Sequence, residues 1–262
     1  MSVKDDAGRE AGSRSPAGRV AAWRAPWRLR RAGRAELLAI HDALFAAFGP
    51  QGWWPGKTPF EVMVGAILTQ NTNWRNVERA IANLRVARAL TPAAMARLRP
   101  GALAELIRPA GYFRVKAARL GNLIDHLRRR HGGSVARLLR RPLPGLRDEL
   151  LSISGIGPET ADSILLYAAG HPSFVVDAYT KRILARHGLV AAAAGYAEVQ
   201  RIFTRALPAH APLFNEFHAL IVRLGKEFCR PRAPRCAACP LGSRRSAGEC
   251  GRGALAFSPA SQ

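Results

Sequence analysis

Apolar residues recur at helical spacing along most of this chain. Leu37, Leu44 and Phe48 fall on one stripe of the segment 36–48, as they do on the buried face of an amphipathic helix. Only the run 173–176 has β character, and it is too short to build a sheet. The pattern therefore predicts an all-α fold, with helices over 36–48, 58–69, 74–88, 92–98, 101–109, 114–131, 146–153, 159–169, 178–187, 196–207 and 213–228.

Two of these helices begin with a recognisable cap. Thr58-Pro59-Phe60-Glu61 combines a capping box with proline at the first helical position, so we expect a helix to begin there. Thr91-Pro92 repeats the cap and the proline, and Gly132-Gly133 ends the helix predicted over 114–131.

The first residues differ from the rest of the chain. Residues 1–33 are rich in Arg, Ala, Gly and Ser and lack a sustained apolar period, which predicts a disordered basic arm. They contain no continuous apolar run of a secretory signal, and their acidic residues Asp5, Asp6 and Glu10 are untypical of a transit peptide. Elsewhere no stretch reaches the ~18 uninterrupted apolar residues of a membrane span. We therefore expect a cytoplasmic protein with no membrane association.

The charge of the chain is strongly positive. Its 262 residues include 40 Lys and Arg against 18 Asp and Glu, a formal net charge of +22. A coding bias could explain why Arg outnumbers Lys, but it does not explain why acidic residues are so few. Such an excess favours a polyanionic partner held by salt-dependent phosphate contacts. We expect this partner to be nucleic acid.

A glycine hairpin lies between two predicted helices. In the run from Leu150 to Ala161, Gly155 and Gly157 flank the apolar Ile156. Glycine permits positive φ and a close approach of backbone N–H groups to a ligand, and the helix that follows adds its dipole. A plain interhelical turn is the alternative, but together with the basic charge the motif favours binding of a DNA backbone.

The four cysteines of the chain form one run near its end. Cys229, Cys236, Cys239 and Cys250 follow the spacing Cys-x6-Cys-x2-Cys-x10-Cys. In a chain without a secretory signal this favours metal ligation over disulfides. Four thiolates suit either zinc or a [4Fe–4S] cluster. Zinc sites usually pair two short knuckles and this run has only one, so the cluster is favoured over zinc and over unligated cysteines.

Asp177 stands directly before the helix predicted over 178–187. An aspartate in this place is most often an N-cap. A catalytic carboxylate is the alternative, and the residues alone leave both open.

The order of these elements resembles the endonuclease III superfamily of DNA glycosylases. The resemblance covers 59–250 and runs through Ile67-Leu68-Thr69-Gln70-Asn71-Thr72-Asn73, Gly111-Tyr112-Phe113-x2-Lys116-Ala117, the hairpin, Val176-Asp177 and the cysteine run. It implies two helical lobes with DNA and a flipped base between them. One lobe would be a six-helix barrel over 58–166. The other would combine 34–57 with 167–252 and carry the cluster, leaving 253–262 as a tail. It also implies that Asp177 is the catalytic carboxylate.

Two departures from the family's pattern matter. Bifunctional members carry a lysine two residues after the second hairpin glycine, where this chain has Glu159. A carboxylate cannot form an imine, so strand cleavage by that route is closed and a monofunctional enzyme is predicted. The last two cysteines are also further apart than is usual in the family, which bears on the cluster geometry.

Trp53-Trp54-Pro55 and the hairpin helix resemble the 3-methyladenine glycosylase branch most. A base methylated on a ring nitrogen is cationic, so it can stack on electron-rich indoles, although the tryptophans could instead pack the lobes together. Lys226 matches a lysine that lines the pocket in that branch, with a solvated helix lysine as the alternative. The resemblance further implies DNA contacts from Gly155, Ile156, Gly157 and Thr160, and insertion of Gln70 or Asn71 into the space left by the flipped nucleotide.

The expected protein is a monomeric, bacterial and nucleoid-associated DNA glycosylase that acts on double-stranded DNA and releases 3-methyladenine or a related alkylated purine. Glycosylases for uracil, mismatched thymine or mismatched adenine are the nearest alternatives. A non-catalytic damage-binding protein belongs to another class, and Asp177 argues against it. An abasic-site lyase is disfavoured by Glu159.

Overall fold

The computed structural model describes residues 33–242. This part of the chain contains helices and loops but no β-strand, so the predicted all-α fold is confirmed. The predicted tail and most of the predicted basic arm lie outside the described residues. The helices are α1 (Arg34–Phe48), α2 (Pro59–Leu68), α3 (Trp74–Val86), α4 (Pro92–Ala96), α5 (Pro100–Leu106), η1 (Arg108–Ala110), α6 (Phe113–His131), α7 (Val135–Leu139), α8 (Leu143–Leu151), α9 (Pro158–Ser163), η2 (Ile164–Ala168), α10 (Ala178–Arg186), α11 (Tyr196–Ala206), α12 (Ala211–Glu227) and η3 (Cys236–Ala238).

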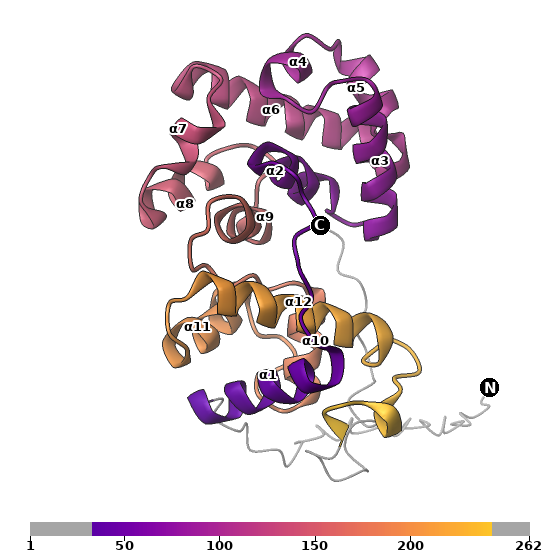
Figure 1. Cartoon of the computed structure of the whole chain (residues 1–262), viewed down its shortest axis with the longest axis vertical. Coiled ribbons are helices and arrows are strands. Elements are labelled where there is room, and N and C mark those ends of the chain that lie inside the picture. Colours follow the sequence, from indigo (N-terminus) through magenta and orange to yellow (C-terminus); the bar gives the residue numbers. More distant parts are fainter. Residues whose placement is uncertain (1–32, 243–262) are drawn as a thin grey trace, which may run out of the picture.

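These helices surround two separate hydrophobic cores. Helices α2 to α9 enclose the first core, and α1 with α10 to α12 enclose the second. Figure 1 shows the two groups as an upper and a lower lobe, with the segment between α1 and α2 crossing from one to the other. The cores meet within η2, a π-helical turn in which Leu165 belongs to the first core and Leu166 to the second. A single helix was predicted over 159–169, and the wider turn lets consecutive side chains face different lobes.

The helix starts follow the predicted caps in part. The hydroxyl of Thr58 accepts from the backbone N–H of Glu61, and that of Thr91 accepts from Ala94. A capping box also requires the Glu61 carboxylate to accept from the backbone N–H of Thr58. That part of the prediction is wrong, because the Glu61 carboxylate is buried and accepts from Arg85 at 2.8 Å. Tertiary packing has taken this carboxylate away from its own helix end.

One short helix was missed. Helix α7 was not expected, although Ser134 caps it in the usual way. The run 173–176, which had β character but was judged too short to build a sheet, forms no strand. Phe174, Val175 and Val176 are buried as extended backbone within the second core. No helix of the described residues is long and apolar enough to cross a membrane.

A buried lysine joins three elements of the first lobe. Lys116 of α6 is 1% exposed, and its Nζ donates to the carbonyls of Leu68 and Ala110, each at 2.8 Å. These carbonyls lie at the end of α2 and in η1, so one side chain satisfies two helix termini.

Replacing Lys116 with methionine should therefore destabilise the protein. The aliphatic part of the side chain would still fill the space, but two buried carbonyls would lose their donor, which costs about 2–4 kcal/mol of unfolding free energy. Equilibrium denaturation measures this, with the exposed Lys57→Met as the matched control. Equal stability of the two variants would show that the two hydrogen bonds contribute nothing.

Candidate active site

Asp177 lies where the second lobe faces the hairpin helix of the first. It is the N-cap of α10: its Oδ1 accepts from the backbone N–H of Thr180 at 2.7 Å and from the Thr180 hydroxyl at 2.8 Å. The N-cap interpretation of the sequence is therefore confirmed. It uses only one carboxylate oxygen, and the side chain keeps 13% of its surface exposed.

The other oxygen of Asp177 faces a histidine that the sequence analysis did not identify. His218 of α12 is 6% exposed, and its Nε2 lies 3.6 Å from Asp177 Oδ2, beyond hydrogen-bond distance. Its Nδ1 lies 2.5 Å from the hydroxyl of Tyr167. Burial, and then the negative charge of Asp177, raises the pKa of Tyr167 well above its ordinary value, so the hydroxyl keeps its proton. If that proton is donated to Nδ1, the proton of the neutral imidazole is on Nε2 and points toward Asp177.

Two opposing effects act on the Asp177 carboxyl. Burial would raise its pKa, but the nearby imidazole of His218 and the two hydrogen bonds from Thr180 hold the pKa below its ordinary value. Asp177 is therefore a carboxylate at neutral pH. A fixed negative charge that remains partly open to solvent can stabilise a positive charge that develops nearby.

Glu159 brings a second carboxyl close to Asp177. It stands in the first turn of α9, and its own surface is exposed. Desolvation by the surrounding protein, followed by the negative charge of Asp177, nevertheless raises the pKa of Glu159 to about 7. The imidazole of His218 and the positive charge of Lys181 act in the opposite direction. The two carboxyl groups therefore differ in acidity, with Asp177 the more acidic.

An aromatic cluster lies beside these groups. The rings of Trp53 and Trp54 are 5.2 Å apart, and each lies within about 5 Å of Trp74. Trp54 also contacts Tyr167, at 5.1 Å between centroids. The Nζ of Lys226 lies 5.7 Å from the Trp53 ring centre, so two residues of the predicted base pocket meet in the structure.

Trp54 differs from Trp53 in its packing. A Cβ built on Gly65 of α2 would lie 3.0 Å from the Trp54 ring, so this indole fits closely against a helix backbone. Trp54 therefore packs against the first core, whereas Trp53 faces Lys226.

The hairpin has the predicted helix–turn–helix form, between α8 and α9. Gly155 has φ 95°, and a Cβ there would lie 2.3 Å from Arg119 Cγ, so only glycine suits this position. Gly157 has φ −91° and needs no such freedom, but it is exposed at the N-cap of α9. Ile156 between them is buried in the first core.

Gln70 and Thr160 lie behind this turn. Gln70 Nε2 donates to the carbonyl of Gly155 at 3.0 Å and to Thr160 Oγ1 at 2.8 Å, and its Oε1 accepts from Arg119. Thr160 is 5% exposed. Both side chains, predicted to contact DNA, are used in bracing the hairpin. Asn71 is exposed, with φ 52° at the tip of the loop after α2.

A second buried carboxylate, which the sequence analysis also missed, ties the hairpin to the segment that leads to Asp177. Asp162 of α9 is fully buried, and its carboxylate accepts hydrogen bonds from Arg147 Nε at 2.8 Å and from Arg147 Nη2 at 3.1 Å. It also accepts from Ser173, Tyr196 and Gln200 at 2.7–2.9 Å. Side chains from α8, from the segment before α10 and from α11 therefore converge on one carboxylate of α9. We call this set of five residues the Asp162 clamp.

Three of the four cysteines lie within the described residues, on the loop after α12. Cys229 is buried, and its Sγ accepts from Arg186 at 3.4 Å. Arg186 and its neighbour Arg182 also bind backbone carbonyls between Gly225 and Pro231. Cys236 and Cys239 bound a short 3-10 turn, and Cys250 lies outside the described residues. Three thiols on one loop, whose backbone carbonyls are held by Arg182 and Arg186, fit the chemistry of a metal or iron–sulfur site.

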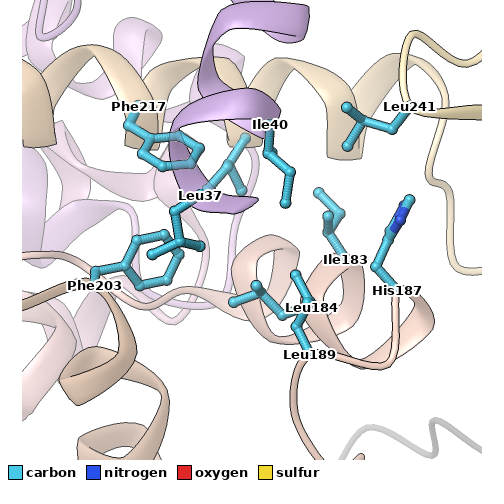
Figure 2. Close-up of a pocket in the computed structure, with 10 residues that line it drawn as sticks. Leu37, Ile40, Ile183, Leu184, His187, Leu189, Phe203, Phe217 and Leu241 are labelled. Carbon is cyan, nitrogen blue, oxygen red and sulfur yellow. The ribbon is translucent and has the colours of Figure 1, made fainter. Parts of the chain in front are cut away.

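An enclosed apolar cavity in the second lobe is not part of this site. Figure 2 shows it between α1, α10 and α12, lined by side chains such as Leu37, Ile183 and Leu241. It measures about 10 Å³, which is at the lower limit for one water molecule. It therefore holds no ligand and is a packing defect of the core.

Comparison with known proteins agrees with this geometry. Residues 64–209 match the family model described as HhH-GPD superfamily base excision DNA repair protein. A protein of Methanocaldococcus jannaschii, provisionally named a DNA repair glycosylase, is 48% identical over 204 residues, covering 77% of this chain and 92% of the relative. Endonuclease III of Thermotoga maritima is 31% identical over 184 residues, covering 70% of this chain and 80% of that relative.

A solved structure is similar as well. The crystal structure of H. pylori 3-methyladenine DNA glycosylase bound to 1,N6-ethenoadenine has 28% sequence identity and a TM-score of 0.64, over 76% of this chain and 98% of that one. Because the family model spans more than half of the chain, the protein belongs to the HhH-GPD superfamily and is a DNA glycosylase of base excision repair.

Proposed function

We propose that this glycosylase is monofunctional and releases 3-methyladenine or a related alkylated purine from double-stranded DNA. The observation that carries this proposal is the position of the Asp177 carboxylate, with one oxygen bound to Thr180 and the other left for chemistry, opposite a hairpin that has Glu159 instead of a lysine.

The reaction is a hydrolysis of the N-glycosidic bond. As the bond to the base breaks, its electron pair leaves with the base and positive charge develops on the sugar. The Asp177 carboxylate stabilises that charge, as carboxylates do in glycoside hydrolysis. A water molecule then adds to C1′ and loses a proton, which leaves an abasic site. Glu159, with its raised pKa, is a suitable acceptor for that proton.

The absence of lyase activity follows from the residues near the hairpin. An imine needs an uncharged amine at C1′, and position 159 offers only a carboxyl. Borohydride should therefore trap no covalent adduct between wild-type protein and DNA. A trapped adduct would contradict the monofunctional assignment and point to Lys181 or Lys226.

The DNA would be held by the hairpin and by a residue inserted at the damaged pair. Gly157 is exposed at the N-cap of α9, so a phosphate can approach the first backbone N–H groups of that helix, and the net charge of +22 supports sequence-independent contacts. Of the two candidates for insertion we favour Asn71, because Gln70 is already hydrogen-bonded at both ends of its amide.

We also propose that Cys229, Cys236, Cys239 and Cys250 hold a [4Fe–4S] cluster with a structural role. When bound, such a cluster would join the loop after α12 to the chain near Cys250 through four thiolate ligands. Anaerobically purified protein should contain about four irons per chain and absorb broadly near ~400 nm, and Cys236→Ser should lose both signals. A colourless protein with one bound zinc would replace the cluster with the zinc alternative.

The substrate preference would come from Trp53. Its ring already lies near one cation, the exposed ammonium of Lys226, which can swing into solvent when a base enters. A desolvated cationic base on the same indole gains up to ~2 kcal/mol that a neutral base does not.

Trp53→Ala should therefore slow release of 3-methyladenine about tenfold or more relative to any neutral lesion that the enzyme accepts. Single-turnover release from two duplexes, one with 3-methyladenine and one with the neutral lesion, measures this ratio. Trp74→Ala is the matched control, because it removes an indole of the same cluster that does not contact Lys226. If Trp53→Ala slows charged and neutral bases equally, the tryptophan serves packing alone.

A further inference from the structure

A second group of chemically active side chains lies in the first lobe, away from Asp177. His126 and His131 belong to α6 and Glu149 to α8, two helices of the upper lobe in Figure 1. His126 Nε2 and His131 Nε2 lie 2.8 Å and 2.6 Å from the same oxygen, Glu149 Oε1. Their side chains are only 15%, 9% and 10% exposed.

The geometry of this group is close to that of a metal site. The two nitrogens and the carboxylate oxygen all lie within 4.8 Å of one another. In a tetrahedral zinc site with Zn–N bonds of about 2.0–2.1 Å, the centres of two imidazole rings are about 5 Å apart. The rings of His126 and His131 have centroids 5.9 Å apart. Ligation would therefore require only small shifts of side chains that already converge.

We propose that His126, His131 and Glu149 form a binding site for one zinc-class divalent cation. Two imidazoles and one carboxylate suit zinc, cobalt or nickel better than magnesium or calcium, which prefer oxygen ligands alone. Three protein ligands leave the fourth position for water. Because Glu149 lies in α8, the first helix of the hairpin, the ion would cross-link that helix to α6.

Two arginines near the group repel a cation but do not occupy the position between the three ligand atoms. Arg141 forms an ion pair with the other oxygen, Glu149 Oε2, and its side chain is 48% exposed. The Arg137 guanidinium lies near the carbonyl of His131. The Arg141 side chain is about half exposed, so it can turn toward solvent, and it contacts Oε2 and not Oε1. The alternative is a network without metal, in which the histidines only donate hydrogen bonds to Glu149.

The metal site and the network without metal predict different effects when both histidines are replaced with glutamine. His126→Gln and His131→Gln together place amide N–H donors near the positions of the Nε2 atoms, so hydrogen bonding to Glu149 is retained while both imidazole ligands are lost. Arg141→Ala removes a positive charge and keeps all three ligands. The cysteines are the same in every variant, so differences between variants isolate this site.

The test is calorimetric titration of the full-length protein, without a histidine tag, with Co²⁺ or Zn²⁺ at neutral pH. We expect one binding event in the wild type that weakens at least about tenfold in the double glutamine variant and becomes tighter in Arg141→Ala. The ion should also raise the Tm of the wild type by several degrees and leave that of the double variant unchanged. Equal binding by wild type and double variant, or no binding by the wild type, overturns the proposal. Neither outcome bears on the glycosylase assignment.

Discussion

Asp177→Asn is expected to slow base release by about 10²–10³-fold, the usual effect of removing one electrostatic partner of a transition state. Asparagine caps helices as well as aspartate does, so the hydrogen bonds to Thr180 and the start of α10 are kept. The substitution therefore separates the two roles of this residue. DNA binding should be retained or become tighter, because a negative charge near phosphate is removed. Single-turnover release with a damaged duplex measures the chemistry.

The control for this experiment is the loss of a cap elsewhere. Thr91→Ala removes the cap of α4, costs about 1 kcal/mol of stability and should leave base release unchanged. Near-normal turnover of Asp177→Asn would reduce Asp177 to a helix cap. It would also mean that another residue stabilises the transition state.

Asp162→Ala is expected to lower the free energy of unfolding by about 3 kcal/mol or more. Removing one partner of a buried ion pair leaves the other charge uncompensated, here the guanidinium of Arg147, which keeps about a third of its surface exposed. The hydrogen bonds from Tyr196 and Gln200 are lost as well. Because Gln200 also donates to the carbonyl of Phe174, the segment that leads to Asp177 should loosen, and base release should fall with stability.

Asp148→Ala is the matched control for the clamp. Asp148 lies next to Arg147 in α8 and is exposed, so the same change of charge should cost less than about 1 kcal/mol. Chemical denaturation of both variants compares them directly. A variant Asp162→Ala as stable as Asp148→Ala would show that the five residues of the Asp162 clamp do not hold the lobes together.

Local signals in the sequence predicted most of the helices and the framework of the site. The caps at Thr58 and Thr91, the glycine at Gly155 and the aspartate at the start of α10 each depend on residues within one or two helical turns. Such features appear in a single sequence because the residues that determine them are neighbours. The glycine hairpin and the N-cap position of Asp177 were predicted for this reason, whereas the catalytic role of Asp177 was implied by the resemblance to the glycosylase family.

The parts that could not be predicted depend on contacts between distant residues. Gln70 donates to Gly155 across 85 positions, and Tyr167 binds His218 across 51. Neither residue has a spacing or a neighbour that marks its partner. The same is true of Glu61, whose side chain joins Arg85 instead of completing its capping box. Only the packing of the two lobes brings such groups together, so the fold has to be known before the site is complete.

We propose that this glycosylase hydrolyses the bond to an alkylated purine without cutting the strand. The most direct test compares single-turnover release from DNA containing 3-methyladenine with release from DNA containing uracil or mismatched thymine. We expect faster release of 3-methyladenine, with an intact abasic strand as the product. Faster release of uracil or thymine, or strand cleavage that accompanies base loss, would show that the proposed function is wrong.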